Sequence, residues 1–136
     1  MLKRTLPIAF LGLSACISGA PICEPMEIPQ PPEGSLGWQG IGQTIVDGAA
    51  ITPVRVIEDS RCPIDLHCIT GGRVVVRTEL TLPGEAETRT VEMSMGQRER
   101  IADGQVMLVG VWPDQHFGCQ LRSRDYLFAY RFYDGR

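Results

Sequence analysis

Five side chains that could bind a metal lie in two short stretches of this sequence. Cys62, His67 and Cys68 lie within "CPIDLHC", and His116 and Cys119 lie within "HFGC". Thiolate sulfur and imidazole nitrogen are good ligands for zinc and copper. However, the C-x5-C spacing is longer than the C-x2–4-C of common zinc motifs, and the C-x-x-C of thiol oxidoreductases is absent. Zinc or copper binding by these five residues is therefore an alternative hypothesis.

Groups that could support catalysis are sparse. The sequence has two histidines, and neither G-x-S-x-G nor H-E-x-x-H occurs in it. Asp59 and Asp65 flank Cys62, and paired carboxylates can cleave glycosidic bonds. Carboxylates in a turn are more often solvated surface charges. We therefore expect a protein that is not an enzyme and uses no cofactor.

The first residues of the chain have the organisation of a secretory signal peptide. Lys3 and Arg4 precede the apolar segment "TLPIAFLGLSA", which ends in small residues. An apolar segment this short does not span a bilayer as a helix, which takes about 20 residues. The sequence therefore predicts that residues 1–15 are a signal peptide and that the remainder is exported.

The stretch "LSAC", residues 13–16, resembles the lipobox of bacterial lipoproteins. The resemblance implies cleavage before Cys16, a diacylglyceryl group on its sulfur, and a further acyl chain such as palmitate on the new amino terminus. Several acyl chains anchor a protein firmly, because each buried methylene contributes about 0.8 kcal/mol. Ile17, rather than an aspartate, follows the cysteine. This resembles the default signal for the outer membrane, so we expect a lipoprotein there that faces the periplasm.

With Cys16 lipidated, four of the five cysteines remain, and exported chains normally convert paired cysteines to disulfides. Four cysteines allow three pairings. We expect Cys62 to pair with Cys68, which closes a local loop and contributes about 2.4 kcal/mol in the chain-entropy model. Cys23 would then pair with Cys119 and contribute about 4.7 kcal/mol. The other two pairings stay open.

The chain divides into a tether and one domain. Residues 16–37 are rich in proline and glycine and show no periodicity, which predicts a semi-rigid tether. Residues 38–136 have the length of a single domain. Loss of Lys3 and Arg4 leaves 11 of the 13 basic residues against 16 acidic ones. Nucleic acid is therefore not an expected partner. The expected partners are the membrane, through the lipid anchor, and an unidentified envelope protein or glycan.

The domain shows the alternating hydrophobicity of β-strands. In "GRVVVRTELTL", for example, Val74, Val76, Thr78 and Leu80 share one face. Further strands are expected at 42–48, 51–59, 88–95, 105–112 and 125–133, and turn residues separate them. We therefore expect an all-β fold: an antiparallel β-sandwich (Ig-like) or a small barrel of six to seven short strands, stapled by disulfides.

Two sets of side chains on these strands could bind ligands, but both are better explained by core packing. The last strand has four aromatic residues on one face, a possible sugar- or peptide-binding platform: Tyr126, Phe128, Tyr130 and Phe132. The "MSM" stretch offers thioether ligands that suit copper(I). Met93 and Met95 are expected to share the inward face of their strand with Val91, which favours core packing.

The stretch "EDSRCPIDLHCITGGRVVV" resembles a signature, D-S-R-C-P-x4-C-x3-G before an apolar strand. The signature occurs in an uncharacterised family of small secreted proteins and lipoproteins of proteobacteria. The similarity extends over most of residues 40–132. It implies a type of domain and no particular activity.

The loop in this signature has two open interpretations. As a structural corner, Asp59 would cap the turn while Arg61 pairs with Asp59 or Asp65. As a recognition loop, Asp59, Arg61, Asp65 and His67 would be presented to a partner, a protease being one example. The sequence therefore predicts a non-catalytic binding or structural β-domain.

Overall fold

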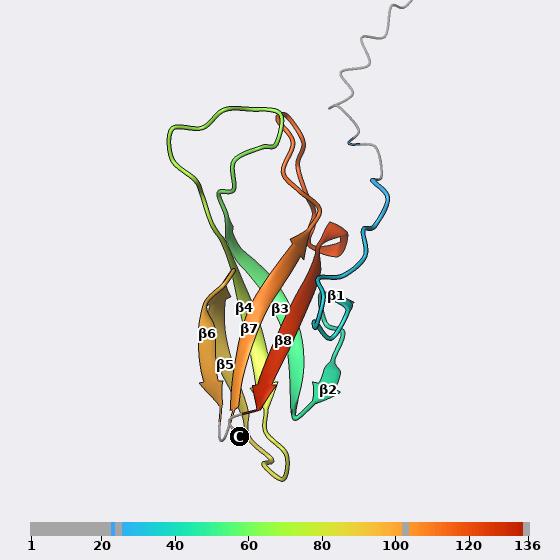
Figure 1. Cartoon of the computed structure of the whole chain (residues 1–136), viewed down its shortest axis with the longest axis vertical. Helices are drawn as coiled ribbons and strands as arrows, with labels where there is room; N and C mark the ends of the chain where they lie inside the picture. The colour runs from blue at the N-terminus through green and yellow to red at the C-terminus, as the bar shows by residue number, and fades with distance from the viewer. Residues whose placement is uncertain (1–22, 24–25, 102–103, 135–136) are drawn as a thin grey trace, which may run out of the picture.

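The structure is a computed structural model that describes residues 23, 26–101 and 104–134 (Figure 1). The expected signal peptide, residues 1–15, and the expected lipidation site, Cys16, lie outside the described residues. Both therefore stay predictions. Within the described residues, no helix has the length and hydropathy needed to cross a bilayer.

The described residues form eight strands and one short 3-10 helix. These are β1 (Trp38–Gly40), β2 (Ile45–Asp47), β3 (Ala49–Asp59), β4 (Val74–Thr81), β5 (Thr88–Ser94), β6 (Arg98–Ile101), β7 (Gly104–Trp112), η1 (Ser123–Asp125) and β8 (Leu127–Asp134). The sequence predicted six of these strands. It missed β1 and β6, which have 3 and 4 residues and are too short to show an alternating pattern.

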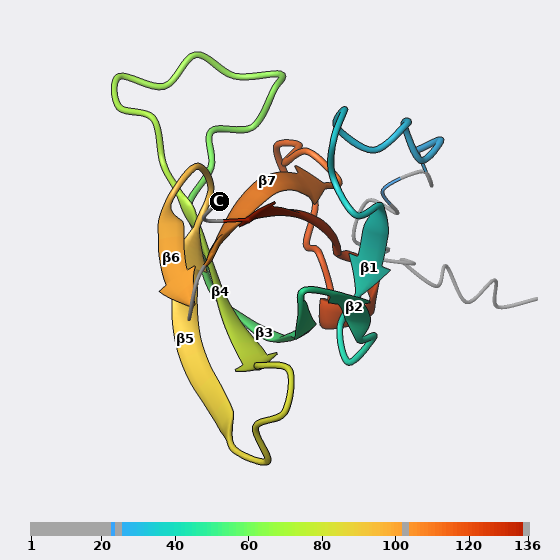
Figure 2. The ribbon, with the colours of Figure 1, turned by 60° about the horizontal axis from the view of Figure 1, so that its bottom comes forward.

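The strands form two four-stranded antiparallel sheets, in the orders β1-β8-β7-β6 and β2-β3-β4-β5. The fold is an antiparallel sandwich, one of the two architectures that the sequence predicted, and it is stapled by two disulfides. Consecutive strands are neighbours, apart from the two places where the chain passes between sheets. This order is that of a meander rather than the Greek key of immunoglobulin domains. Figure 2 shows how the two sheets curve around a shared core.

The core lies between the inward faces of β4 and β8. Val74, Val76 and Leu80 of β4 are at most 1% exposed, as their alternation predicted. Phe128 and Tyr130 of β8 are fully buried, so the aromatic stripe serves the core rather than a binding platform. The hydrophobic effect over these faces is the main force that holds the two sheets together.

The two methionines of "MSM" differ from each other. Met93 is 1% exposed and belongs to the core, as expected. Met95 is 53% exposed, so the prediction that it shares the inward face was wrong. The reason is that β5 ends at Ser94. The chain then turns at Gly96, whose positive φ of 77° suits glycine.

The expected tether is attached to the domain over much of its length. Residues 26–37 contain no strand or helix. The Trp38 indole nitrogen donates to the Pro29 carbonyl at 2.8 Å, and the Leu36 amide donates to the Tyr130 carbonyl at 2.8 Å. Arg131 donates to the carbonyl of Glu33. These contacts hold the segment against β8, so the packed body begins before residue 38.

Candidate functional site

Two loops lie at the same end of the sandwich and form what we call the loop end, residues 60–73 and 113–122. The first connects β3 to β4, and the second follows β7 and leads to η1. Figure 1 shows both loops at the top, with the blue start of the described chain also at that end. The last described residues of β8 lie at the opposite end.

Two disulfides hold the loop end, and their pairing is the one expected from the sequence. Cys62 is bonded to Cys68, with their Cα atoms 5.9 Å apart. Cys23 is bonded to Cys119, with their Cα atoms 5.7 Å apart, and this bond fixes the N-terminal segment to the second loop. All four sulfurs are therefore unavailable as thiolate ligands.

Three of the five residues in the metal hypothesis, Cys62, Cys68 and Cys119, are thus excluded as ligands. The two that remain, His67 and His116, are not brought together in a metal-binding cluster. Across residues 23, 26–101 and 104–134, no group of three or more histidine, cysteine, aspartate or glutamate side chains is arranged to hold a metal. His116 instead contacts the sulfur of Met26, with 3.2 Å between Nε2 and Sδ. This contact supports the attachment of the N-terminal segment to the loop end.

A largely buried ion pair lies beneath the first loop. Arg61 donates through Nη2 and Nε to the two carboxylate oxygens of Asp59, at 2.7 and 2.8 Å. The Tyr126 hydroxyl donates to the same carboxylate at 2.9 Å. The Arg61 guanidinium also donates to the carbonyls of Val111 at 3.4 Å and Pro113 at 3.0 Å. The ion pair therefore joins the base of one loop to the base of the other.

The environment keeps both partners of this pair charged. Burial alone would raise the pKa of Asp59, but the hydrogen bonds and charge of Arg61 outweigh it and lower that pKa. For Arg61, burial would lower the pKa, and Asp59 outweighs it and raises that pKa. Burial, together with Asp59, raises the pKa of the Tyr126 hydroxyl. A carboxylate held ionised in this way braces the structure and is poorly suited to proton transfer.

Two further hydrogen bonds tie the loops together near their tips. The Ile64 amide donates to the Gln115 carbonyl at 2.8 Å. The Phe117 amide donates to the carboxylate of Asp65 at 2.9 Å. Asp65 therefore fixes the second loop and is not the partner of Arg61. Of the two candidate partners for Arg61, the structure selects Asp59.

The expected recognition residues are thus mostly occupied in bracing. The side chains of Asp59 and Arg61 are only 5% and 16% exposed. Asp65 bonds to the opposite loop. His67 is exposed. A partner could therefore reach His67 directly, whereas Asp59 and Arg61 set the shape of the loop.

The loop end exposes large apolar side chains that sequence reasoning missed. Ile64 is 61% exposed, Leu66 43%, Ile69 104% and Phe117 70%. Three of them lie in "CPIDLHCI", whose proline and paired cysteines exclude a regular strand or helix. Apolar residues in such a stretch have no obvious core to enter, and this signal could have identified them. All four lie on the two loops of the loop end, and exposed apolar side chains that gather in one region commonly mark an interaction site.

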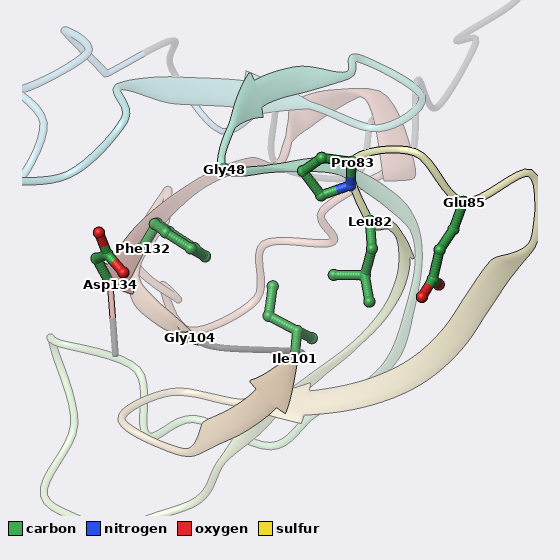
Figure 3. A pocket seen from close by; sticks show the side chains of 8 residues that line it. All are labelled: Gly48, Leu82, Pro83, Glu85, Ile101, Gly104, Phe132 and Asp134. Atoms are coloured by element: carbon green, nitrogen blue, oxygen red, sulfur yellow. The ribbon is translucent and has the colours of Figure 1, made fainter. Parts of the chain in front are cut away.

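A small cavity lies at the opposite end of the sandwich (Figure 3). Its volume is about 260 Å³, and it is lined by Gly48, Leu82, Pro83, Glu85, Ile101, Gly104, Phe132 and Asp134. The Phe132 ring lies against Gly48 and Gly104, since a Cβ on these glycines would be only 2.5 and 2.7 Å from it. The ring therefore fills the space that a larger side chain at either position would need. Ligand pockets usually enclose about 300–1,000 Å³.

The loop end is therefore the better candidate for a functional site. It combines exposed apolar side chains with covalent and polar bracing, whereas the cavity is small. The chain matches no protein-family model, no curated protein and no solved structure.

Proposed function

We propose that this chain is an exported, lipid-anchored β-domain that acts by binding rather than catalysis, with the loop end as its binding surface. The observation that carries the proposal is the exposure of Ile64, Leu66, Ile69 and Phe117 on braced loops. Large apolar side chains contribute most to binding where they become desolvated.

Bracing makes such a surface effective. Ordering a flexible side chain or loop on binding costs about 0.5–1.5 kcal/mol for each immobilised side chain. The Cys62–Cys68 disulfide and the Asp59–Arg61 pair brace residues 59–68 of the first loop before any partner arrives. The hydrogen bond from Phe117 to Asp65 fixes the second loop in the same way. A preformed surface therefore loses less conformational entropy when it binds.

The proposed location is the bacterial envelope, with a lipid at Cys16. Two disulfides suit an oxidising compartment such as the periplasm. The lipobox-like "LSAC" and the preceding apolar segment support the anchor. The resemblance of the following residue to the outer-membrane default supports placement on that membrane, facing the periplasm.

The anchor is tested by producing the full chain in a Gram-negative host and measuring the intact mass of the membrane-extracted protein. We expect loss of residues 1–15, a lipid increment on Cys16, and no alkylation of the four other cysteines without reductant. Cys16→Ala should abolish the increment and release the protein from washed membranes. An unmodified Cys16 in the wild-type chain would show that the anchor proposal is wrong.

The binding surface is tested in living cells with a photo-crosslinking amino acid placed at position 117. Position 46 provides the control, because Val46 is also an exposed apolar residue, at 74%, but lies in β2. We expect adducts, whether to protein or to lipid, from position 117 and few from position 46. Equal yields from the two positions would contradict the choice of the loop end.

A further inference from the structure

We infer that the surface bound by the loop end is the membrane to which the chain is anchored, so that Ile64, Leu66, Ile69 and Phe117 contact lipid. This inference rests on the proposed lipid at Cys16 and adds an occupant for the same surface. It follows from the position of the anchor relative to the loops.

The chain between the lipid and the loop end is short. Residues 17–22 separate Cys16 from Cys23. Seven residue steps span at most about 25 Å even when fully extended. Cys23 is bonded to Cys119, which belongs to the loop end. The Cα atoms of the two bonded cysteines are 5.7 Å apart, so the disulfide keeps Cys119 of the loop end within about 31 Å of the lipidated residue, whatever the intervening conformation.

The opposite end of the domain is not constrained in this way. The 11 residues of β3 extend over about 33 Å from the region of the cavity to the loop end. The contact between Met26 and His116 holds the next part of the N-terminal segment at the loop end as well. No described contact brings this part of the segment to the opposite end. The lipid anchor thus favours an orientation in which the loops face the bilayer.

The chemistry of the loop suits the boundary between headgroups and acyl chains. The stretch from Cys62 to Gly72 contains no lysine or arginine, and its one acidic residue is Asp65. The other exposed charges of the loop end are Arg73, which pairs with Glu58, and Asp114 and Arg122 of the second loop. The Asp65 carboxylate already accepts a hydrogen bond from the Phe117 amide. Contact with lipid would therefore be mainly apolar, in contrast to the electrostatic binding of polybasic segments.

The backbone limits how deep the loops can enter. Irregular backbone has unsatisfied polar groups that are costly in hydrocarbon. Hydrogen bonds from the Ile64 amide to the Gln115 carbonyl and from the Leu66 amide to the Pro63 carbonyl satisfy some of these polar groups. Interfacial segments bury their apolar face about 5–10 Å into the boundary region, where water and headgroups still reach the backbone. The loop end is expected to reach that depth and no further.

The experiment uses the lipidated full chain, reconstituted into vesicles of phosphatidylethanolamine and phosphatidylglycerol with brominated acyl chains. Bromine quenches nearby tryptophan fluorescence. Phe117→Trp reports on the loop end, and Val46→Trp is the matched control on β2. The wild-type chain, with Trp38 and Trp112, gives the background. Relative to vesicles without bromine, we expect the emission added by Phe117→Trp to fall about twofold, because its side chain would lie at the headgroup–acyl boundary. The emission added by Val46→Trp should be the same in both kinds of vesicle.

Further arms separate an apolar contact from other causes. Adding Ile69→Ser to Phe117→Trp should weaken the quenching, because it removes a fully exposed apolar side chain from the same surface. High salt should leave the quenching unchanged, since screening acts on charges. Quenching that disappears in high salt would contradict an apolar contact.

The intact mass of the same preparation separates the two proposals. If Cys16 is lipidated and Phe117→Trp is not quenched, the membrane inference is wrong while the anchor stands, and a protein partner becomes the occupant to seek. If Phe117→Trp and Val46→Trp are quenched equally, the expected orientation is wrong. If Cys16 has no lipid, the anchor and the inference are both wrong.

Discussion

Replacing Asp59 with alanine should destabilise the protein strongly. The substitution removes the carboxylate that binds Arg61 at 2.7 Å and Tyr126 at 2.9 Å. Arg61 is left with a side chain only 16% exposed. Its remaining hydrogen-bond partners are the uncharged carbonyls of Val111 and Pro113, while the Asp114 carboxylate contributes a smaller charge interaction. The cost arises because a guanidinium stays in a poorly hydrated place without its counterion.

The expected magnitude follows from the burial of the pair. Removing one partner of a buried ion pair costs about 3–5 kcal/mol. The carbonyl contacts and the residual exposure of Arg61 place the expected value for Asp59→Ala near the lower limit, at about 3 kcal/mol. For a domain of this size, 1 kcal/mol lowers Tm by about 4–8 °C, so the expected fall is about 12 °C or more.

The assay is equilibrium unfolding in urea with the disulfides intact, followed by tryptophan fluorescence. Glu58→Ala is the matched control. Glu58 is adjacent in sequence and pairs with Arg73 at 2.9 Å, but this pair is exposed, at 39% and 68% for the two side chains. Exposed pairs contribute little to stability. Asp59→Ala should therefore lower the urea midpoint clearly, whereas Glu58→Ala should leave it almost unchanged.

A midpoint for Asp59→Ala that equals that of Glu58→Ala would refute the reasoning, because burial would then not distinguish the two pairs.

A pH series provides a second check. The pKa of Asp59 is lowered in the folded protein, relative to an unfolded value of about 3.9. The carboxylate thus stabilises the fold above pH about 4, and this contribution is lost as pH falls through the lowered pKa. The stability difference between wild type and Asp59→Ala should shrink in that range.

Two other pairs of substitutions test the base of the loop and the core. Gly72→Ala should lower the urea midpoint, because its Cβ would lie 1.4 Å from the Ser60 carbonyl oxygen, whereas Gly71→Ala, with no atom within 4 Å, should not. Equal midpoints would contradict this close approach. The Thr78 and Tyr130 hydroxyls are hydrogen-bonded at 2.9 Å in the core. Thr78→Val should cost about 1–3 kcal/mol, and adding Tyr130→Phe should recover much of it, whereas strictly additive losses in a double-mutant cycle would refute the coupling.

Much of the fold could be predicted from local sequence patterns. Alternation in β4 identified Val76 and Leu80 as core residues, because successive side chains of a strand point to opposite faces. The aromatic stripe of β8 was assigned to the core for the same reason. The 3-residue strand β1 was missed, because it is too short to show alternating hydrophobicity. It is a strand because it pairs with β8 in the folded protein. Met95 was misplaced because the end of β5 depends on the turn at Gly96.

The candidate site could be predicted only in part. The sequence identified the loop around Cys62 and Cys68 and the disulfide that closes it, because both cysteines are close in the chain. It left two partners open for Arg61. The choice of Asp59 depends on Tyr126 and on carbonyls about 50 residues away, which only the folded chain brings together.

By itself, the sequence determined the all-β class and the disulfide-closed loop, because each depends on short-range patterns of hydrophobicity or on local motifs, whereas the lipid anchor stays a prediction. The tertiary structure decided what the loop presents. Whether Ile64, Ile69 and Phe117 are buried or exposed depends on how two distant loops meet at one end of the sandwich. Exposure is a property of the packed whole, so the local pattern of "CPIDLHCI" could suggest that its apolar side chains lack a core to enter but could not bring Phe117 to the same end of the sandwich.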